Sequence, residues 1–249
     1  MVKHATQRRP RLRLRELLRS SRGDGLPPGQ REVSEFPRFS RKPSQGLPTV
    51  PASPEVRITG AVAHAADLLI GDLQQLPREE RTADFNCVTT WCVRGLRWGG
   101  VPFRTFYEDI IVSRCQPAEN VRWLRIVGLD GGSAIVALED ALRDEVLLAD
   151  SLDGEPLTLV HGAPLRFVSP AQYAYKSVKH LALIELSVEQ PALGADEHPR
   201  ARVALEERHP RHPASRVRGP SRLVAPMIAF LAERSARRAG ARAEPSAEN

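Results

Sequence analysis

Between Val56 and Val188 the chain alternates between short strand-like and short helix-like segments, without a regular strand–helix–strand period. Apolar and polar residues alternate from Val56 to Gly60, which is typical of a strand. Further strands are predicted at 81–87, 123–127, 134–136, 165–168 and 181–188, and the second and third of these flank a hairpin turn at Asp130-Gly131-Gly132. Short helices are predicted at 68–76, 102–112 and 138–143. This mixture indicates an α+β fold.

The two ends of the chain differ from the middle in charge. Residues 1–22 contain eight Lys/Arg and one acid, and residues 200–249 contain eleven Arg and five acids, which leaves 17 basic and 24 acidic residues between them. We therefore predict a basic tail at 1–24, a folded domain at 25–190, and a Pro- and Arg-rich extension at 191–249 with a terminal helix at 225–239. Such basic ends are typical of solvated tails or of contacts with anionic partners.

Several broad classes of protein do not fit the sequence. No stretch approaches the ~18 uninterrupted apolar residues of a membrane-spanning helix. The Arg-rich start lacks the apolar region of a signal peptide, and three cysteines do not make a disulfide framework, so we expect a cytoplasmic protein with reduced thiols. The basic ends lack interleaved aromatic residues, so nucleic acid is not an expected partner.

The cysteines allow more than one interpretation when only residue types and spacing are considered. Cys87 and Cys92 are spaced as Cys-x4-Cys with no nearby histidine, which falls short of the four ligands that structural zinc needs. Cys87 paired with His161 or His180 would suit nucleophilic catalysis. A cysteine that simply packs in the core is the third possibility.

Four blocks of sequence, in order and in spacing, narrow these possibilities. The first has Cys-Val-x-x-Trp starting at Cys87 and Trp-x-Gly-Val-Pro starting at Trp98. The other three blocks span 147–157, 161–170 and 173–180, and the last leads to Ile184-Glu185. From about residue 25 to residue 189 the chain resembles the molybdopterin-binding domain of the sulfite oxidase superfamily. The resemblance implies that superfamily's fold of mixed β-sheets with short helices.

The same resemblance implies a molybdenum–molybdopterin cofactor and assigns residues to it. Cys87 corresponds to the single protein thiolate on molybdenum, and thiolate is a soft ligand that suits this metal. The remaining matched positions correspond to contacts with the pterin and its phosphate, and they are His161, Arg166, Ser177, Val178 and Lys179. Arginine offers phosphate a planar fork, and lysine offers it a point charge.

Two positions depart from the pattern of sulfite oxidases. Asp150 follows the Leu-Leu-Ala run where those enzymes have a tyrosine, and Val88 and Thr89 stand in place of an arginine pair. An ionised aspartate only accepts hydrogen bonds and repels anions, which argues against sulfite as the substrate. The Cys-Val-x-x-Trp motif resembles that of bacterial members of the superfamily, including methionine sulfoxide reductase catalytic subunits, more than that of sulfite oxidases. We predict a catalytic, proton-transferring Asp150; the alternative is an exposed turn residue.

The implied reaction is two-electron oxygen-atom transfer to or from a small-molecule oxo acceptor or donor. The chain has no haem-attachment motif, no iron–sulfur cysteine set and no dinucleotide fingerprint, so we expect a separate redox partner protein, and the sequence does not specify whether it carries haem or flavin. The basic ends are candidate docking surfaces for that partner. The alternative is a cofactor-free binding protein that retains the fold.

Overall fold

The computed structural model describes residues 26, 31–33, 46–73, 75–87 and 91–192. The predicted basic tail and the predicted helix at 225–239 lie outside the described residues, as does nearly all of the predicted extension at 191–249. The division into these three parts therefore stays a prediction. No helix among the described residues is long and apolar enough to span a membrane.

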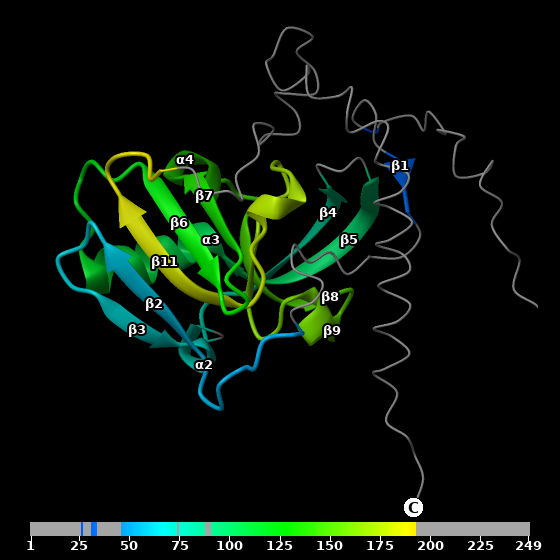
Figure 1. Cartoon of the computed structure of the whole chain (residues 1–249), viewed down its shortest axis with the longest axis horizontal. Coiled ribbons are helices and arrows are strands. Elements are labelled where there is room, and N and C mark those ends of the chain that lie inside the picture. The colour runs from blue at the N-terminus through cyan, green and yellow to red at the C-terminus, as the bar shows by residue number, and fades with distance from the viewer. Residues whose placement is uncertain (1–25, 27–30, 34–45, 74, 88–90, 193–249) are drawn as a thin grey trace, which may run out of the picture.

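The described strands form two sheets that lie side by side in Figure 1. The first sheet has the order β1-β5-β8-β10, with β4 also paired to β5 and β9 to β8. Its strands are β1 (Arg31–Glu32), β4 (Glu79–Asn86), β5 (Trp91–Pro102), β8 (Leu147–Leu152), β9 (Glu155–Pro156) and β10 (Arg166–Val168). The second sheet has the order β3-β2-β11-β6-β7. Its strands are β2 (Glu55–Gly60), β3 (Ala66–Leu69), β6 (Trp123–Gly128), β7 (Ser133–Ala137) and β11 (Leu181–Ser187).

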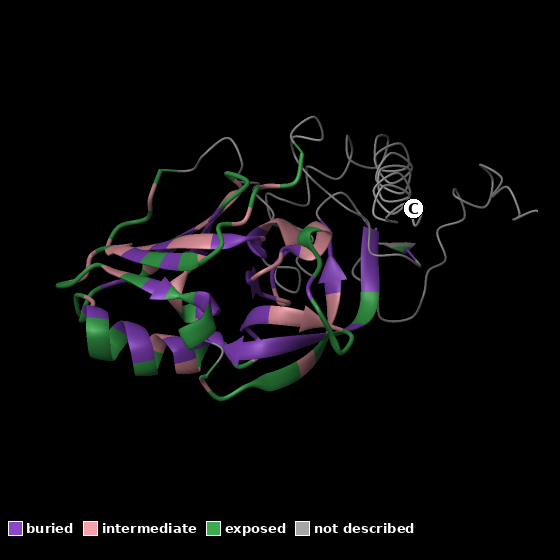
Figure 2. Cartoon of the chain, turned by 90° about the horizontal axis from the view of Figure 1, so that it is seen from below, coloured by how far each residue is buried: buried purple, intermediate pink, exposed green. Residues whose placement is uncertain are grey.

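The helices between these strands are short. They are α2 (Ile70–Leu73), α3 (Phe103–Phe106), α4 (Leu138–Ala141), the π-helix η1 (Tyr107–Cys115), and the 3₁₀ turns η2 (Leu159–His161) and η3 (Ala174–Lys176). α3 continues directly into η1, and this longer helix packs under the second sheet with its outer side exposed (Figure 2). The α+β class with mixed sheets and short helices is confirmed.

Most predicted elements are present, and two predicted helices need correction. The hairpin of β6 and β7, the strands β2, β4, β10 and β11, and the turn α4 lie where they were predicted. The predicted helix at 68–76 is wrong over its first residues, because Leu68 and Leu69 pair with β2 as part of β3 and only α2 is helical. Pairing with a neighbouring strand outweighs the local preference there. The predicted helix at 102–112 begins one residue later, after Pro102, and extends to Cys115.

The sequence did not reveal β1, β3, β5, β8 and β9, and the longest of these strands is β5, which lies between β4 and β8 in the first sheet. It pairs with β4 on one side and with β8 on the other, so it buries most of its length. The sequence pattern does not predict this strand, because β5 contains several glycines and glycine is depleted in strands. Gly100 is needed there, since a Cβ atom at this position would lie 2.1 Å from the backbone oxygen of Leu148. Close approach of two backbones is a recognised reason for glycine inside a strand.

The inner strands of the first sheet, β5, β8 and β10, carry buried residues on both faces. Leu148 and Phe167 belong to the larger core, which is shared with the second sheet and the α3–η1 helix. Leu147, Ala149 and Trp98 belong to a smaller core on the opposite face. Neighbouring residues of β8 thus enter different cores, as the alternation of a strand requires. The buried inner strands of this sheet are visible in Figure 2.

We predict that Gly100→Ala destabilises the protein by about 3 kcal/mol or more, because the added methyl group overlaps backbone atoms that cannot move away. Gly71→Ala is the matched control, since a Cβ atom at Gly71 would meet nothing within 4 Å. Urea denaturation of both variants measures the difference. Equal stabilities of the two variants would contradict the close packing of β5 on β8.

Candidate cofactor site

Cys87 lies immediately after β4, at the point where the chain leaves the first sheet. Its backbone N–H donates to the backbone oxygen of Trp91 at 2.8 Å, which closes the loop through 88–90. Those three residues lie outside the described part of the chain. Cys87 is buried and belongs to the smaller core with Phe85, Trp91 and Trp98. The predicted metal ligand is thus on the face of the first sheet that carries the smaller core.

Arg166 is the polar residue that organises this face. It lies on β10 directly opposite Ala149 of β8 and is 1% exposed. One terminal nitrogen, Nη1, donates to the backbone oxygen of His161 at 2.7 Å, and Nη2 donates to the backbone oxygen of Ser177 at 3.0 Å. A single guanidinium therefore holds two of the segments that the sequence assigned to the cofactor.

The charge of Arg166 is not balanced by an acid in the part of the chain that the structure describes. No carboxylate pairs with Arg166 there, and its Nε has no hydrogen-bond acceptor. Burial lowers the pKa of Arg166 to about 9, so the side chain is still protonated at neutral pH. A buried charge normally requires an ionic or hydrogen-bonding partner. The site therefore fits an anionic group such as the phosphate of a pterin cofactor.

Ser177, Val178 and Lys179 form a short run that lies against β10. The Ser177 hydroxyl accepts a hydrogen bond from the backbone N–H of Ser169 at 3.0 Å. The backbone oxygen of Val178 accepts one from the N–H of Phe167 at 2.9 Å. These contacts place the run beside Arg166.

The lysine of this run ties it to the segment around His161. Lys179 Nζ donates to the backbone oxygen of Val160 at 2.9 Å, and His161 Nδ1 lies 3.2 Å from the Thr158 hydroxyl. Gly162 has a φ of 109°, and a Cβ atom there would lie 3.0 Å from the Cβ of Lys179. The glycine thus allows the two segments to meet. The five predicted cofactor residues thus lie on β10 or on segments that are hydrogen-bonded to it or to one another.

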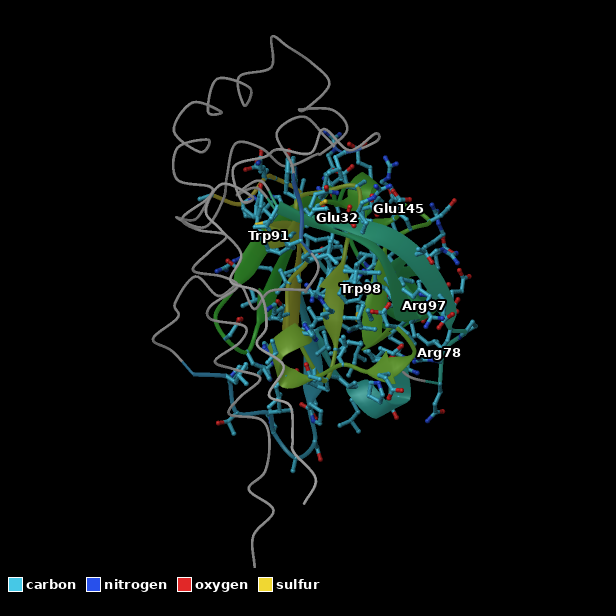
Figure 3. All side chains as sticks on the ribbon, turned by 90° about the vertical axis from the view of Figure 1, so that its right-hand side faces the viewer. Glu32, Arg78, Trp91, Arg97, Trp98 and Glu145 are labelled. Carbon is cyan, nitrogen blue, oxygen red and sulfur yellow. The ribbon has the colours of Figure 1, made fainter. Side chains whose placement is uncertain are left out.

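Asp150 is placed differently. It follows Ala149 on β8, at the point where the pairing register with β5 shifts between Gly99 and Gly100. Both carboxylate oxygens accept from Arg78, each at 2.6 Å. This contact raises the pKa of Arg78. Figure 3 shows Arg78 toward the right-hand edge of the molecule and Trp98 nearer its middle. The catalytic role of Asp150 stays a prediction.

The other two cysteines are buried away from reactive surroundings. Burial, with Asp84 and Glu32 nearby, raises the pKa of Cys92 to about 12. Burial also raises the pKa of Cys115, which lies in the larger core. None of the three cysteines forms a disulfide. Cys92 and Cys115 are therefore packed thiols with little thiolate character at neutral pH.

Sequence reasoning missed two aromatic residues of the site. The rings of Phe85 and Trp98 lie over the Arg166 guanidinium, with its central carbon 5.2 Å and 4.9 Å from their centroids. Both residues stand inside the first sequence block, so the block contained them but not their contact with a residue 68 or more positions away. No spacing rule connects residues so distant in sequence.

Comparison with known proteins identifies the family. The model of the oxidoreductase molybdopterin-binding domain matches residues 45–193, and the chain belongs to this family. The resemblance to the sulfite oxidase superfamily is thereby confirmed, as is the prediction of a molybdopterin cofactor. The match covers all five predicted cofactor residues as well as Cys87.

Curated relatives are similar over part of their length. The chain is 34% identical over 134 residues to the uncharacterized oxidoreductase YuiH of Bacillus subtilis, covering 54% of this chain and 65% of that protein. It is 30% identical over 156 residues to the protein-methionine-sulfoxide reductase catalytic subunit MsrP of Gluconobacter oxydans, covering 55% and 47% of the two. The chain thus spans between about half and two thirds of these relatives' length.

A solved structure supports the fold. A chain of the sulfane dehydrogenase SoxCD from Paracoccus pantotrophus superposes with a TM-score of 0.50 and 21% sequence identity. The match covers 60% of this chain and 44% of that one. At this identity the likeness concerns the fold, and it confirms the predicted sulfite-oxidase-type arrangement of sheets.

We predict that Asp150→Asn and Arg78→Met destabilise the protein to a similar extent, by about 1–2 kcal/mol, because each removes one partner of a half-buried ion pair that solvent partly screens. Chemical denaturation measures both losses. A catalytic role of Asp150 would appear as a further loss of turnover, with a changed pH profile, in Asp150→Asn but not in Arg78→Met. Unchanged turnover in Asp150→Asn would remove Asp150 from the reaction.

We also predict that acid weakens the fold through His180, which is buried and has Nδ1 2.7 Å from the backbone oxygen of Ala163. Burial lowers the pKa of His180 from 6.5, so the unfolded chain binds a proton that the folded chain disfavours. The resulting stability is fully present above pH 6.5 and is lost as the pH falls below it. Urea midpoints between pH 8 and about 5 measure this loss.

The control for this measurement is His180→Asn, because asparagine tolerates the left-handed backbone that His180 adopts at a φ of 51°. This variant should lose part of the pH dependence. His64→Asn, at an exposed position, should keep all of it. Identical pH profiles for wild type and His180→Asn would rule out the contribution of His180.

Proposed function

We propose that this chain is a molybdopterin-dependent oxidoreductase that carries out two-electron oxygen-atom transfer on a small-molecule oxo donor or acceptor. The observation that carries the proposal is the buried Arg166, whose charge has no acidic partner among the described residues. It lies on the same face of the first sheet as Cys87. Membership of the molybdopterin-binding family supports the assignment of the anion that this cation would bind.

The described residues would divide the binding of the cofactor between them. Cys87 would be the single thiolate ligand of the metal. Arg166 and Lys179 would neutralise the phosphate, and the Ser177 hydroxyl would donate its proton to an acceptor on the cofactor, since its oxygen already accepts from Ser169. When bound, the cofactor supplies the two-electron redox chemistry. The chain then has to bind, orient and shield it.

The contacts around Arg166 prepare the site before the cofactor arrives. Two of its five N–H groups are already used on the carbonyls of His161 and Ser177, so the guanidinium plane is fixed. The Nε, buried and without an acceptor in the described part of the chain, is left for the ligand. A fixed donor costs less entropy on binding than a mobile one. His161 would contribute through its imidazole, which the Thr158 hydroxyl orients.

The class of substrate is proposed from the relatives. The MsrP proteins are named as reductases of methionine sulfoxide in proteins, and their identity to this chain supports an oxygen-bearing substrate. Asp150, by contrast, is paired with Arg78, and its proposed part in proton transfer rests on its position in the sequence block alone. Sulfite remains a disfavoured substrate, because Val88 and Thr89 replace the arginine pair of sulfite oxidases and Asp150 replaces their tyrosine.

We further propose a separate redox partner and a cytoplasmic location. The MsrP relatives are named catalytic subunits, which supports a partner protein. The basic tails, at +7 for residues 1–22 and +6 for residues 200–249, would suit an acidic partner surface. The proposal of a reducing compartment is supported by three buried cysteines that form no disulfide.

The experiment that tests the proposed function is metal and pterin analysis of protein from a molybdenum-competent host. The wild type should contain about one molybdenum and one pterin per chain, and Cys87→Ser should lose most of the molybdenum because the harder hydroxyl is a poor substitute for thiolate. Cys115→Ala is the matched control, since this thiol lies in the other core, and it should keep both. A wild type without molybdenum and pterin would instead favour a cofactor-free binding protein.

A further inference from the structure

The guanidinium of Arg166 lies between two aromatic side chains. Its central carbon is 5.2 Å from the ring centroid of Phe85 and 4.9 Å from that of Trp98, both within the range of a cation–π contact. The two rings are 5.8 Å apart and are tilted by 44°. They come from β4 and β5, whereas Arg166 comes from β10. Three strands of the first sheet thus converge on one positive charge.

This surrounding differs from the usual way of burying arginine. A buried guanidinium is normally paired with a carboxylate, because an isolated charge loses its hydration. A carboxylate would neutralise the charge and compete with any anionic ligand. The faces of Phe85 and Trp98 stabilise the cation through their quadrupoles without carrying a net charge. The backbone carbonyls of His161 and Ser177 also stabilise the cation without carrying a net charge, because they interact with it as dipoles.

We propose that Phe85 and Trp98 form an aromatic clamp that positions Arg166 and keeps its positive charge available to the phosphate of the cofactor. This inference rests on the proposed function, since it concerns the same site. It makes Phe85 and Trp98 positioning residues, which act on the cofactor through Arg166.

The clamp also lies next to the predicted metal ligand. Phe85 lies two residues before Cys87, which directly follows β4, and both side chains belong to the smaller core. Phe85 pairs with Val93 of β5, and the N–H of Cys87 is held by Trp91 of the same strand. The end of β4 thus carries one ring of the clamp and leads directly to the predicted metal ligand.

The test compares full-length variants purified from a molybdenum-competent host. Phe85→Leu removes one ring of the clamp, and Phe85→Tyr restores it. Leu96→Ala is the matched control, because Leu96 belongs to the same core and its truncation costs a similar amount of packing. Pterin retained after timed gel filtration, measured by its fluorescence, reports cofactor release. Urea denaturation of each variant reports folding.

We expect Phe85→Leu to release the pterin about tenfold faster than wild type, as loss of a desolvated cation–π contact implies. Phe85→Tyr and Trp98→Phe should release it nearly as slowly as wild type. Leu96→Ala should lose stability but keep its release rate. Equal release from Phe85→Leu and wild type, or equal acceleration in Leu96→Ala, would overturn the clamp while leaving the proposed function intact. A wild type that carries no pterin would overturn both.

Discussion

The site depends on the hydrogen bonds that the buried, positively charged guanidinium of Arg166 donates to two neighbouring segments. Its terminal nitrogens hold the carbonyls of His161 and Ser177, which belong to segments on either side of β10. Without this cation the two segments would lose their common donor, and two buried carbonyl groups would be left to find other partners. The same cation has no acid beside it in the described part of the chain. Among the described residues the charge is balanced only by dipoles, which leaves it able to attract an anionic ligand.

The inner strands of the first sheet make this arrangement possible because they carry buried residues on both faces. One face joins the larger core and gives β8 and β10 a rigid support. The other face carries Cys87 and the aromatic rings around Arg166. Gly100 lets β5 and β8 approach closely between these layers. A site built on paired strands holds its groups more firmly than one built on loops alone.

Local sequence patterns were sufficient for part of the fold. The hairpin of β6 and β7 followed from alternation around Asp130-Gly131-Gly132, and β2, β4 and β11 followed from their alternating or apolar runs. These local patterns gave the wrong prediction, or none, where pairing with another strand decides the structure. Leu68 is in a strand because it pairs with Val56. Gly100 of β5 has to be glycine because the backbone of β8 lies too close for a Cβ atom. Neither partner is visible from a local window of sequence.

The sequence by itself determined the family, and it predicted the residues of the cofactor site, because Cys87, His161, Arg166 and the run from Ser177 to Lys179 stand in ordered blocks that resemble that family. Only the tertiary structure decided how these residues are arranged. It paired Asp150 with Arg78 and placed Phe85 and Trp98 on Arg166. The physical reason is that burial and charge pairing depend on contacts between strands far apart in sequence, and those contacts exist only once both sheets have formed.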